Sequence, residues 1–182
     1  MGEGFRNVGG EVAALDAPDR LIHRPRPSPY GGGKKGDSDH ALGRSRGGLS
    51  TKINAVVDEA GRPVCIVLTA GQASDKAAVE AMLEGLPAAD HLVADRGYDA
   101  QAILNLVRQH GAEPHIPTQR DRKVQRSVDR ALYRQRNLVE RFFNKIKQLR
   151  KIATRYEQSA RNYLAAILIA ASQIWLRYES AS

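Results

Sequence analysis

Short apolar segments alternate with helical segments along most of this chain of 182 residues, and that alternation limits its fold more than any other feature. Residues 51–58 and 63–69 have the pattern of two strands joined by a turn that contains Gly61. Residues 91–94 and 113–116 predict two more short strands, separated by a helix. Strands and helices in this order pack as layers, so the sequence predicts an α/β fold.

Capping residues and apolar periodicity predict where the helices lie. Ser74 is expected to cap a helix that follows the paired strands. Asp99 is expected to cap a second helix, which ends at Gly111. A long helix is predicted over residues 128–150, and a final helix over residues 159–178 is apolar enough to be buried.

The N-terminal part of the chain differs in composition from the rest. Residues 11–16 fit a short strand that ends at Asp16, whereas residues 18–36 are rich in Pro, Arg and Gly. Because proline lacks a backbone donor and fixes φ, that second stretch is expected to be a loop outside the core. We therefore expect an irregular segment over residues 1–36, which contains the first strand, and one folded domain over residues 37–182.

The charge balance and the single cysteine restrict the function. The net charge of +8 favours an anionic partner such as nucleic acid, although an unselective basic surface is also compatible with it. The lone Cys65 excludes an internal disulfide and argues against a thiolate-rich zinc site. The longest apolar run, residues 163–176, is shorter than the roughly 20 residues of a membrane span. No membrane contact and a cytoplasmic location are expected.

The predicted helix over residues 128–150 carries the most informative polar pattern. At 100° per residue, four of its side chains fall on one stripe about 60° wide. A carboxylate therefore lies among cations that could hold a polyanion. A pair at positions i and i+4 is also common on exposed helices, so geometry alone leaves a plain surface ion pair open. The four residues are Tyr133, Arg136, Glu140 and Lys147.

A second carboxylate, Asp95, follows the apolar strand over residues 91–94 and precedes Gly97. Open α/β sheets place ligand-binding groups at the carboxyl ends of their strands, which favours a functional role for Asp95. An aspartate in this position can equally be a turn residue. Both interpretations remain open on this evidence.

These segments resemble those of a known family. The spacing Tyr-x2-Arg-x3-Glu-x6-Lys is similar to the signature helix of bacterial DDE transposases of insertion-sequence families four and five. Residues 94–99, Ala-Asp-Arg-Gly-Tyr-Asp, resemble the block around the second aspartate of that group. Residues 43–52 and 68–72 are also similar to it. The resemblance extends over residues 41–178, with the blocks in the order of the family.

The resemblance implies a ribonuclease H-like fold over residues 37–182, with a mixed sheet flanked by helices and a buried C-terminal helix. In such a fold three carboxylates come from distant parts of the chain. Carried onto this sequence, Asp95 is the second aspartate and Glu140 is the glutamate. The first is assigned to Asp16, at the end of the first predicted strand.

The first aspartate has competitors. Asp16 and His23 have the spacing that the family shows, whereas Pro18 departs from the family pattern. Asp19 is a rival for the same role. Asp58 is a more remote alternative, because it belongs to the turn between two predicted strands.

Three converging carboxylates imply a metal centre. Hard oxygen ligands suit Mg²⁺ or Mn²⁺, and two such ions can activate an attacking oxygen and stabilise a leaving one during displacement at phosphorus. Asp16, Asp95 and Glu140 are the expected catalytic residues and metal ligands. Water would cleave the strand, and the freed 3′-hydroxyl of the transposon end would join it to target DNA.

The expected main partner is double-stranded DNA, both transposon ends and target. Basic residues are dense over residues 120–155, where they outnumber the acidic ones. The family normally has an N-terminal recognition region before its catalytic part, and the absence of one here suggests an upstream-frame polypeptide as a further partner. A homodimer is another candidate assembly. The residues expected to contact DNA are Tyr133, Arg136, Arg141, Lys145, Lys147 and Arg150.

Two other functions compete with an active transposase. The unusual setting of Asp16 and the composition of residues 17–30 would also fit a catalytically inactive, DNA-binding remnant of a decayed transposase gene. A cellular ribonuclease H-like nuclease would keep the chemistry and change the substrate, but the complete Tyr-Arg-Glu-Lys pattern argues against it. Tyr98, His110 and His115 are interpreted as structural residues.

Overall fold

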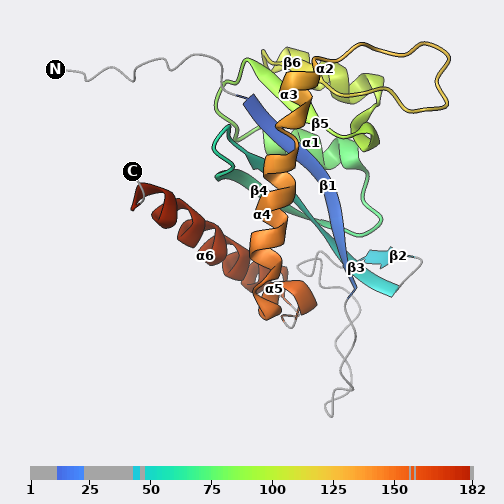
Figure 1. Ribbon diagram of the computed structural model, residues 1–182. Helices are drawn as coiled ribbons and strands as arrows, with labels where there is room; N and C mark the ends of the chain where they lie inside the picture. The colour runs from blue at the N-terminus through green and yellow to red at the C-terminus, as the bar shows by residue number, and fades with distance from the viewer. Residues whose placement is uncertain (1–11, 23–42, 46–47, 156, 158, 181–182) are drawn as a thin grey trace.

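One mixed sheet of six strands forms the centre of the computed structural model (Figure 1). The structure describes residues 12–22, 43–45, 48–155, 157 and 159–180, with side chains from residue 50 onward. The strand order is β2-β3-β1-β5-β6, and β4 also pairs with β3. β1, β5 and β6 are parallel to one another, whereas β3 is antiparallel to its neighbours. The strands are β1 (Val12–Ile22), β2 (Gly43–Ser45), β3 (Gly48–Val57), β4 (Pro63–Ala70), β5 (His91–Ala94) and β6 (Glu113–His115).

Helices cover both faces of this sheet, and alternation along β3 produces two cores. Val56 belongs to a core with the helices α1 and α2, whereas Ile53 and Val57 belong to a core with α4, α5 and α6. Successive strand residues point to opposite faces, which accounts for this division. The mixed α/β fold predicted from the sequence is therefore confirmed. The helices are α1 (Asp75–Leu83), η2 (Arg96–Tyr98), α2 (Gln101–Gln109), α3 (Arg130–Arg134), α4 (Asn137–Lys147), α5 (Arg150–Thr154) and α6 (Ala160–Glu179).

The predicted pair of strands is confirmed as the hairpin β3–β4. Gly61 has φ of +79°, a conformation that glycine adopts without steric cost. The Asp58 carboxylate accepts hydrogen bonds from the amides of Ala60 and Arg62 and pairs with the Arg62 side chain at 2.6 Å. Asp58 therefore stabilises the turn between the two strands.

The first strand is longer than predicted. β1 continues to Ile22, so the expectation that the chain becomes a loop from Pro18 is wrong for the first five residues of that stretch. The pairing of β1 with β3 shifts register between Asp16 and Asp19, and Pro18 lies in this irregularity. A bulge leaves a residue outside the ladder, so the missing amide of proline costs no hydrogen bond there.

The long helix predicted over residues 128–150 is interrupted. Asp129 caps α3, and the chain tightens at Gln135 and Arg136 before α4 begins. The Arg136 amide bonds to the Tyr133 carbonyl three residues back, as in a 3₁₀ turn. Figure 1 shows α3 and α4 following one another along a single rod that crosses the sheet.

Capping was predicted correctly for α1 and wrongly for α2. The Ser74 hydroxyl accepts a hydrogen bond from the Ala77 amide at the start of α1. At α2 the cap position is Ala100, without a side-chain cap, because the Asp99 carboxylate bonds to a distant loop. Gly111 ends α2 as expected, with φ of +99°.

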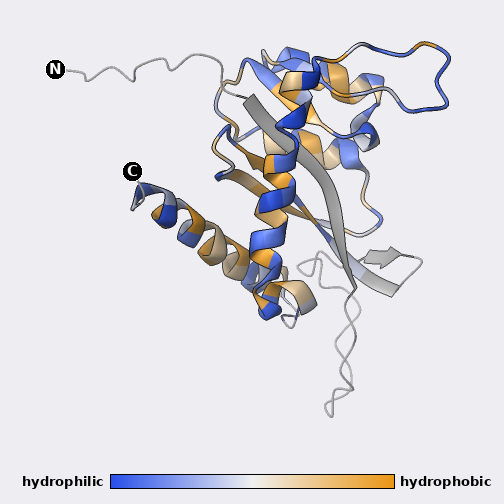
Figure 2. Cartoon of the chain, viewed as in Figure 1, coloured by the Kyte–Doolittle hydropathy of each residue, from blue (hydrophilic) through white to orange (hydrophobic). Residues whose placement is uncertain are grey.

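The C-terminal helix is only half-buried, which corrects the prediction that it lies inside the core. α6 packs against β4, α4 and α5 through one face, which includes Tyr163 and Ile167. Its other face exposes Leu168, Ile169 and Leu176, the last two by 63% and 65%. The middle of α6 is mostly hydrophobic, whereas α4 alternates hydrophilic and hydrophobic bands (Figure 2). Among the described helices, none combines the length and apolar character that crossing a membrane requires.

Candidate active site

Asp95 stands at the carboxyl end of β5, where it caps the 3₁₀ helix η2. Its Oδ1 accepts a hydrogen bond from the Gly97 amide at 2.7 Å. A Cβ added to Gly97 would lie 2.9 Å from that oxygen, so a side chain there would force the Asp95 carboxylate to shift. Within the described residues Oδ2 has no hydrogen-bond partner, and the half-buried side chain can still offer it as a ligand.

The backbone places Asp16 next to Asp95. β1 and β5 pair in parallel up to Leu15 and Ala94, so each aspartate is the first residue beyond that last pair. Asp19 lies on the other side of the register shift, where its partner on β3 is Ile53. Among the aspartates of β1, Asp16 therefore lies at the level of Asp95.

Glu140 is the fourth residue of α4, and its side chain is 46% exposed. Val139, Phe142 and Phe143 hold the opposite side of the helix in the core. Oε1 of Glu140 is 2.6 Å from Nη2 of Arg136, so the predicted pair one helical turn apart forms. An exposed pair of this kind contributes only about 0.3–0.5 kcal/mol.

The rod formed by α3 and α4 packs against the strands that lead to the two aspartates. α3 contacts β5, and α4 contacts β1 and β3. Glu140 lies in the first turn of α4, at the end of that helix that follows α3. The helix with the predicted glutamate thus crosses the strands with the predicted aspartates.

Several cations lie along the same rod or just after it, and Arg136 pairs directly with Glu140. The Arg136 guanidinium lies 5.9 Å from the centre of the Tyr133 ring, so the turn at Gln135 keeps these two side chains together. Lys145 lies 5.2 Å from the Tyr178 ring of α6. Arg141, Lys145, Lys147 and Arg150 are exposed.

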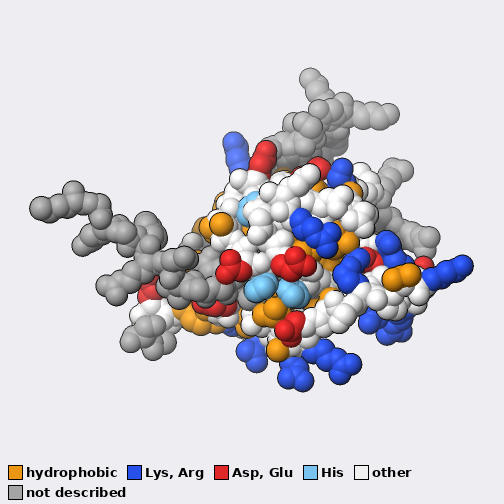
Figure 3. Space-filling view, turned by 90° about the horizontal axis from the view of Figure 1, so that it is seen from above, with side chains coloured by type: hydrophobic (Ala, Val, Ile, Leu, Met, Phe, Trp, Pro, Cys, Tyr) orange, Lys and Arg blue, Asp and Glu red, His pale blue; other side chains and the backbone are white. Residues whose placement is uncertain are grey.

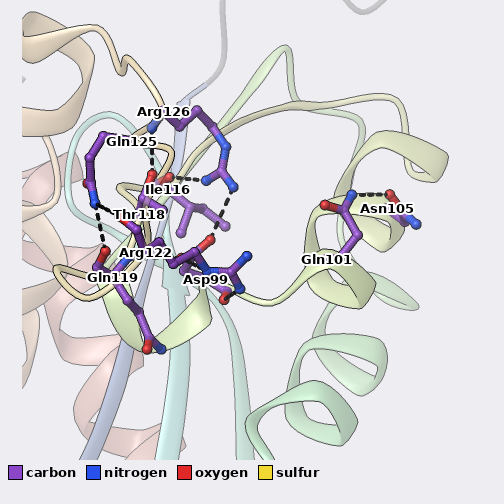
Figure 4. Close-up of polar contacts among 9 residues, drawn as sticks. All are labelled: Asp99, Gln101, Asn105, Ile116, Thr118, Gln119, Arg122, Gln125 and Arg126. Atoms are coloured by element: carbon purple, nitrogen blue, oxygen red, sulfur yellow. Dashed lines mark hydrogen bonds and ion pairs between the residues drawn. The ribbon is translucent and has the colours of Figure 1, made fainter.

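A buried carboxylate near Asp95 was assigned only a capping role from the sequence. The Asp99 side chain is fully buried and accepts a hydrogen bond from the Gln119 amide at 2.8 Å. It also pairs with Arg122 at 3.0 Å and with Arg126 at 3.1 Å (Figure 4). Burial alone would raise the pKa of Asp99, but the amide and the two guanidinium groups hold it below its ordinary value.

Two histidines lie together on another part of the molecule. His91 on β5 and His115 on β6 approach within 3.2 Å through Nδ1 and Nε2. Burial, and then the neighbouring His91, lower the pKa of His115 against the opposing effect of Glu113 and Asp129. In the view of Figure 3, histidines lie among carboxylates, with lysines and arginines around them. His115 is the last residue of β6.

The described side chains alone do not form a metal centre. In the part of the chain whose side chains are described, no three His, Cys, Asp or Glu residues are grouped to hold an ion. Asp16 lies outside that part, so the predicted triad is represented there by Asp95 and Glu140. Both are accessible carboxylates, the donor type that Mg²⁺ and Mn²⁺ prefer.

Known proteins match most of the chain. A family model described as a transposase DDE domain matches residues 8–175. A putative transposase for insertion sequence element IS6501 from Brucella ovis is 34% identical over 130 residues, which are 71% of this chain and all of that relative. No solved structure matches the chain.

Proposed function

The chain belongs to the transposase DDE domain family, and from that membership we propose that it cleaves and joins DNA strands at insertion-sequence ends. The observation that carries this proposal is that the two aspartates occupy matching positions on adjacent strands. Asp16 and Asp95 both follow the last pair of adjacent parallel strands, beneath a rod that carries Glu140. Two aspartates at the ends of adjacent strands, with a glutamate on the helix that crosses them, support a ribonuclease H-like arrangement.

In this proposal the catalytic domain predicted over residues 37–182 takes one strand from the N-terminal segment over residues 1–36. β1 is a central strand between β3 and β5, so the sheet depends on it. The role of the N-terminal segment would therefore be structural as well as catalytic.

Asp16, Asp95 and Glu140 would hold two Mg²⁺ or Mn²⁺ ions. Bound there, the ions would supply Lewis-acid activation of the attacking oxygen and charge stabilisation of the leaving oxygen. The Gly97 amide fixes the orientation of Asp95, and Arg136 orients Glu140. Among the described residues, Oδ2 of Asp95 and Oε2 of Glu140 have no hydrogen-bond or ion-pair partner.

Two displacements at phosphorus make up the reaction. In cleavage the oxygen of water forms a bond to phosphorus, the bond from phosphorus to the 3′-oxygen breaks, and that oxygen leaves as a 3′-hydroxyl after taking a proton. In joining, the freed 3′-hydroxyl attacks a phosphorus of the target and displaces the 3′-oxygen there. No oxidant or reductant is required, because only phosphate esters exchange.

The cations of the rod, with Arg150 at the start of α5, would hold the substrate. Phosphate contacts from lysine and arginine position a duplex without reading its sequence. Transposon ends and target DNA would both bind to this surface. Three expectations stay predictions. They are that the chain forms a homodimer, that it acts with a polypeptide from an upstream reading frame, and that it is cytoplasmic. The proposed contact residues are Tyr133, Arg136, Arg141, Lys145, Lys147 and Arg150.

The choice of the first aspartate has a direct test. We expect Asp16→Asn to abolish cleavage of transposon-end DNA with Mg²⁺ or Mn²⁺, and Asp19→Asn to retain it, because only Asp16 lies level with Asp95. A gel assay of nicked product measures both variants. The reverse pattern would assign the ligand to Asp19. If the unmodified chain bound DNA without cleaving it, the inactive remnant would be the correct description.

Gly97 offers a test of how Asp95 is positioned. We expect Gly97→Ala to lower the cleavage rate by about 10- to 100-fold, because the new methyl group would displace the Asp95 carboxylate. Gly85→Ala is the matched control, since a Cβ there meets nothing within 4 Å. Equal cleavage rates for the two variants would show that the Gly97–Asp95 contact is unimportant for catalysis.

A further inference from the structure

The most completely enclosed carboxylate near the proposed site is that of Asp99, and it bonds to a loop instead of its own helix. Three contacts converge on its two oxygens, from the Gln119 amide and from the side chains of Arg122 and Arg126. Arg126 also donates to the Ile116 carbonyl at 2.6 Å. Figure 4 shows these contacts converging at the base of the loop.

The loop that Asp99 holds is basic and projects from the body of the protein. Residues 118–126, the basic loop, connect β6 to α3 and extend away from the sheet (Figure 1). Arg122 and Arg126 are directed to Asp99, whereas Arg120 and Lys123 are exposed. In the described part of the chain, neither Arg120 nor Lys123 forms an ion pair. Two cations therefore remain available to an external anion.

Holding the loop in advance has an energetic consequence. Fixing the backbone of one residue costs about 1–2 kcal/mol, and a loop that is ordered only on binding subtracts that cost from its affinity. Asp99 orders the basic loop in the folded protein through contacts at its base. The exposed cations are thereby presented without an ordering cost at the moment of binding.

We infer that Asp99 is a positioning residue that holds the basic loop as a phosphate-binding arm for duplex DNA. This inference rests on the proposed function, and it adds a surface outside the rod of α3 and α4. Asp99 lies four residues after Asp95, with η2 between them. The same short segment would therefore set both the catalytic carboxylate and the arm that holds the DNA beside it.

A comparison of two charge-equivalent variants tests the inference. Asp99→Asn and Asp121→Asn each raise the net charge from +8 to +9, since one of the 20 acidic residues becomes neutral. Asp121 is an exposed residue of the same loop. If charge alone governed binding, both variants would bind DNA at least as tightly as the unmodified chain. The inference predicts weaker binding for Asp99→Asn only.

Binding is measured by fluorescence anisotropy on a labelled duplex of arbitrary sequence, without divalent metal so that cleavage cannot intervene. Loss of one phosphate contact lowers affinity roughly eightfold at 0.1 M salt and reduces the slope of log K against log salt by about 0.9. We expect at least that change for Asp99→Asn. Limited trypsin digestion should also cut within residues 118–126 faster than in the Asp121→Asn control.

A surface variant keeps the test decisive if Asp99→Asn fails to fold. Replacing Arg120 and Lys123 together by Gln alters only exposed side chains, and it should reduce the salt slope by about 1.8. An unchanged slope in that variant, or in a folded Asp99→Asn protein, would overturn the inference. Failure of the unmodified chain to bind any duplex would instead overturn the proposed function.

Discussion

Replacing Glu140 by Gln is expected to lower the rate of strand cleavage by roughly 10³-fold while the protein stays folded. The amide keeps the size of the side chain and an oxygen that can accept from Arg136, but it loses the negative charge that would bind a divalent ion. Glu140 is 46% exposed, so the lost ion pair costs at most about 0.5 kcal/mol of stability. A single-turnover assay of nicked product, together with thermal unfolding, separates the two effects.

The chain contains a matched control for this variant. Glu80 on α1 forms the same type of pair with Lys76, one helical turn away, and is 49% exposed. Glu80→Gln should leave cleavage within about twofold of the unmodified chain. If Glu140→Gln behaved like Glu80→Gln, then the Arg136–Glu140 pair would be an ordinary surface contact and the proposed metal centre would lose one ligand.

Replacing Phe142 by Ala is expected to reduce the free energy of unfolding by about 3–5 kcal/mol. Phe142 is 1% exposed and lies in the core between α4 and the sheet, with its ring centre 5.4 Å from that of Phe143. The substitution would remove buried apolar surface and leave a cavity beneath the rod. Urea unfolding at fixed pH measures the change.

Asn144→Ala is the control for that substitution, because Asn144 is exposed on the same helix. It should change the free energy of unfolding by less than about 0.5 kcal/mol. A loss below about 1 kcal/mol for Phe142→Ala would mean that α4 is not seated on the sheet as the structure shows. The placement of α4, the helix that carries Glu140, against β1 would then have no structural basis.

Local sequence signals predicted most of the fold. Gly61 indicated the hairpin, Ser74 the start of α1 and Gly111 the end of α2, because turns and caps depend on residues close together in the chain. The apolar run of β5 was also predicted with its bounds, and Asp95 was placed directly after it. The stripe of helical residues led to the Arg136–Glu140 pair.

Features that depend on distant partners could not be predicted in the same way. Asp99 has the residue type and position of a helix cap, but two arginines more than twenty residues away compete for its carboxylate. Pro18 indicated a loop, whereas the pairing of β1 with β3 accommodates it at a register shift. The composition of α6 suggested burial, yet burial depends on how many elements cover a helix, and here one face has no cover among the described residues.

The central claim is that Asp16, Asp95 and Glu140 share divalent ions, and Mn²⁺ located by anomalous diffraction in crystals of the protein with transposon-end DNA tests it most directly. We predict Mn²⁺ peaks about 2.0–2.3 Å from carboxylate oxygens of all three residues, as two ions about 3.5–4 Å apart. Mn²⁺ bound elsewhere, with the carboxylates of Asp95 and Glu140 too far apart to share an ion, would contradict the account.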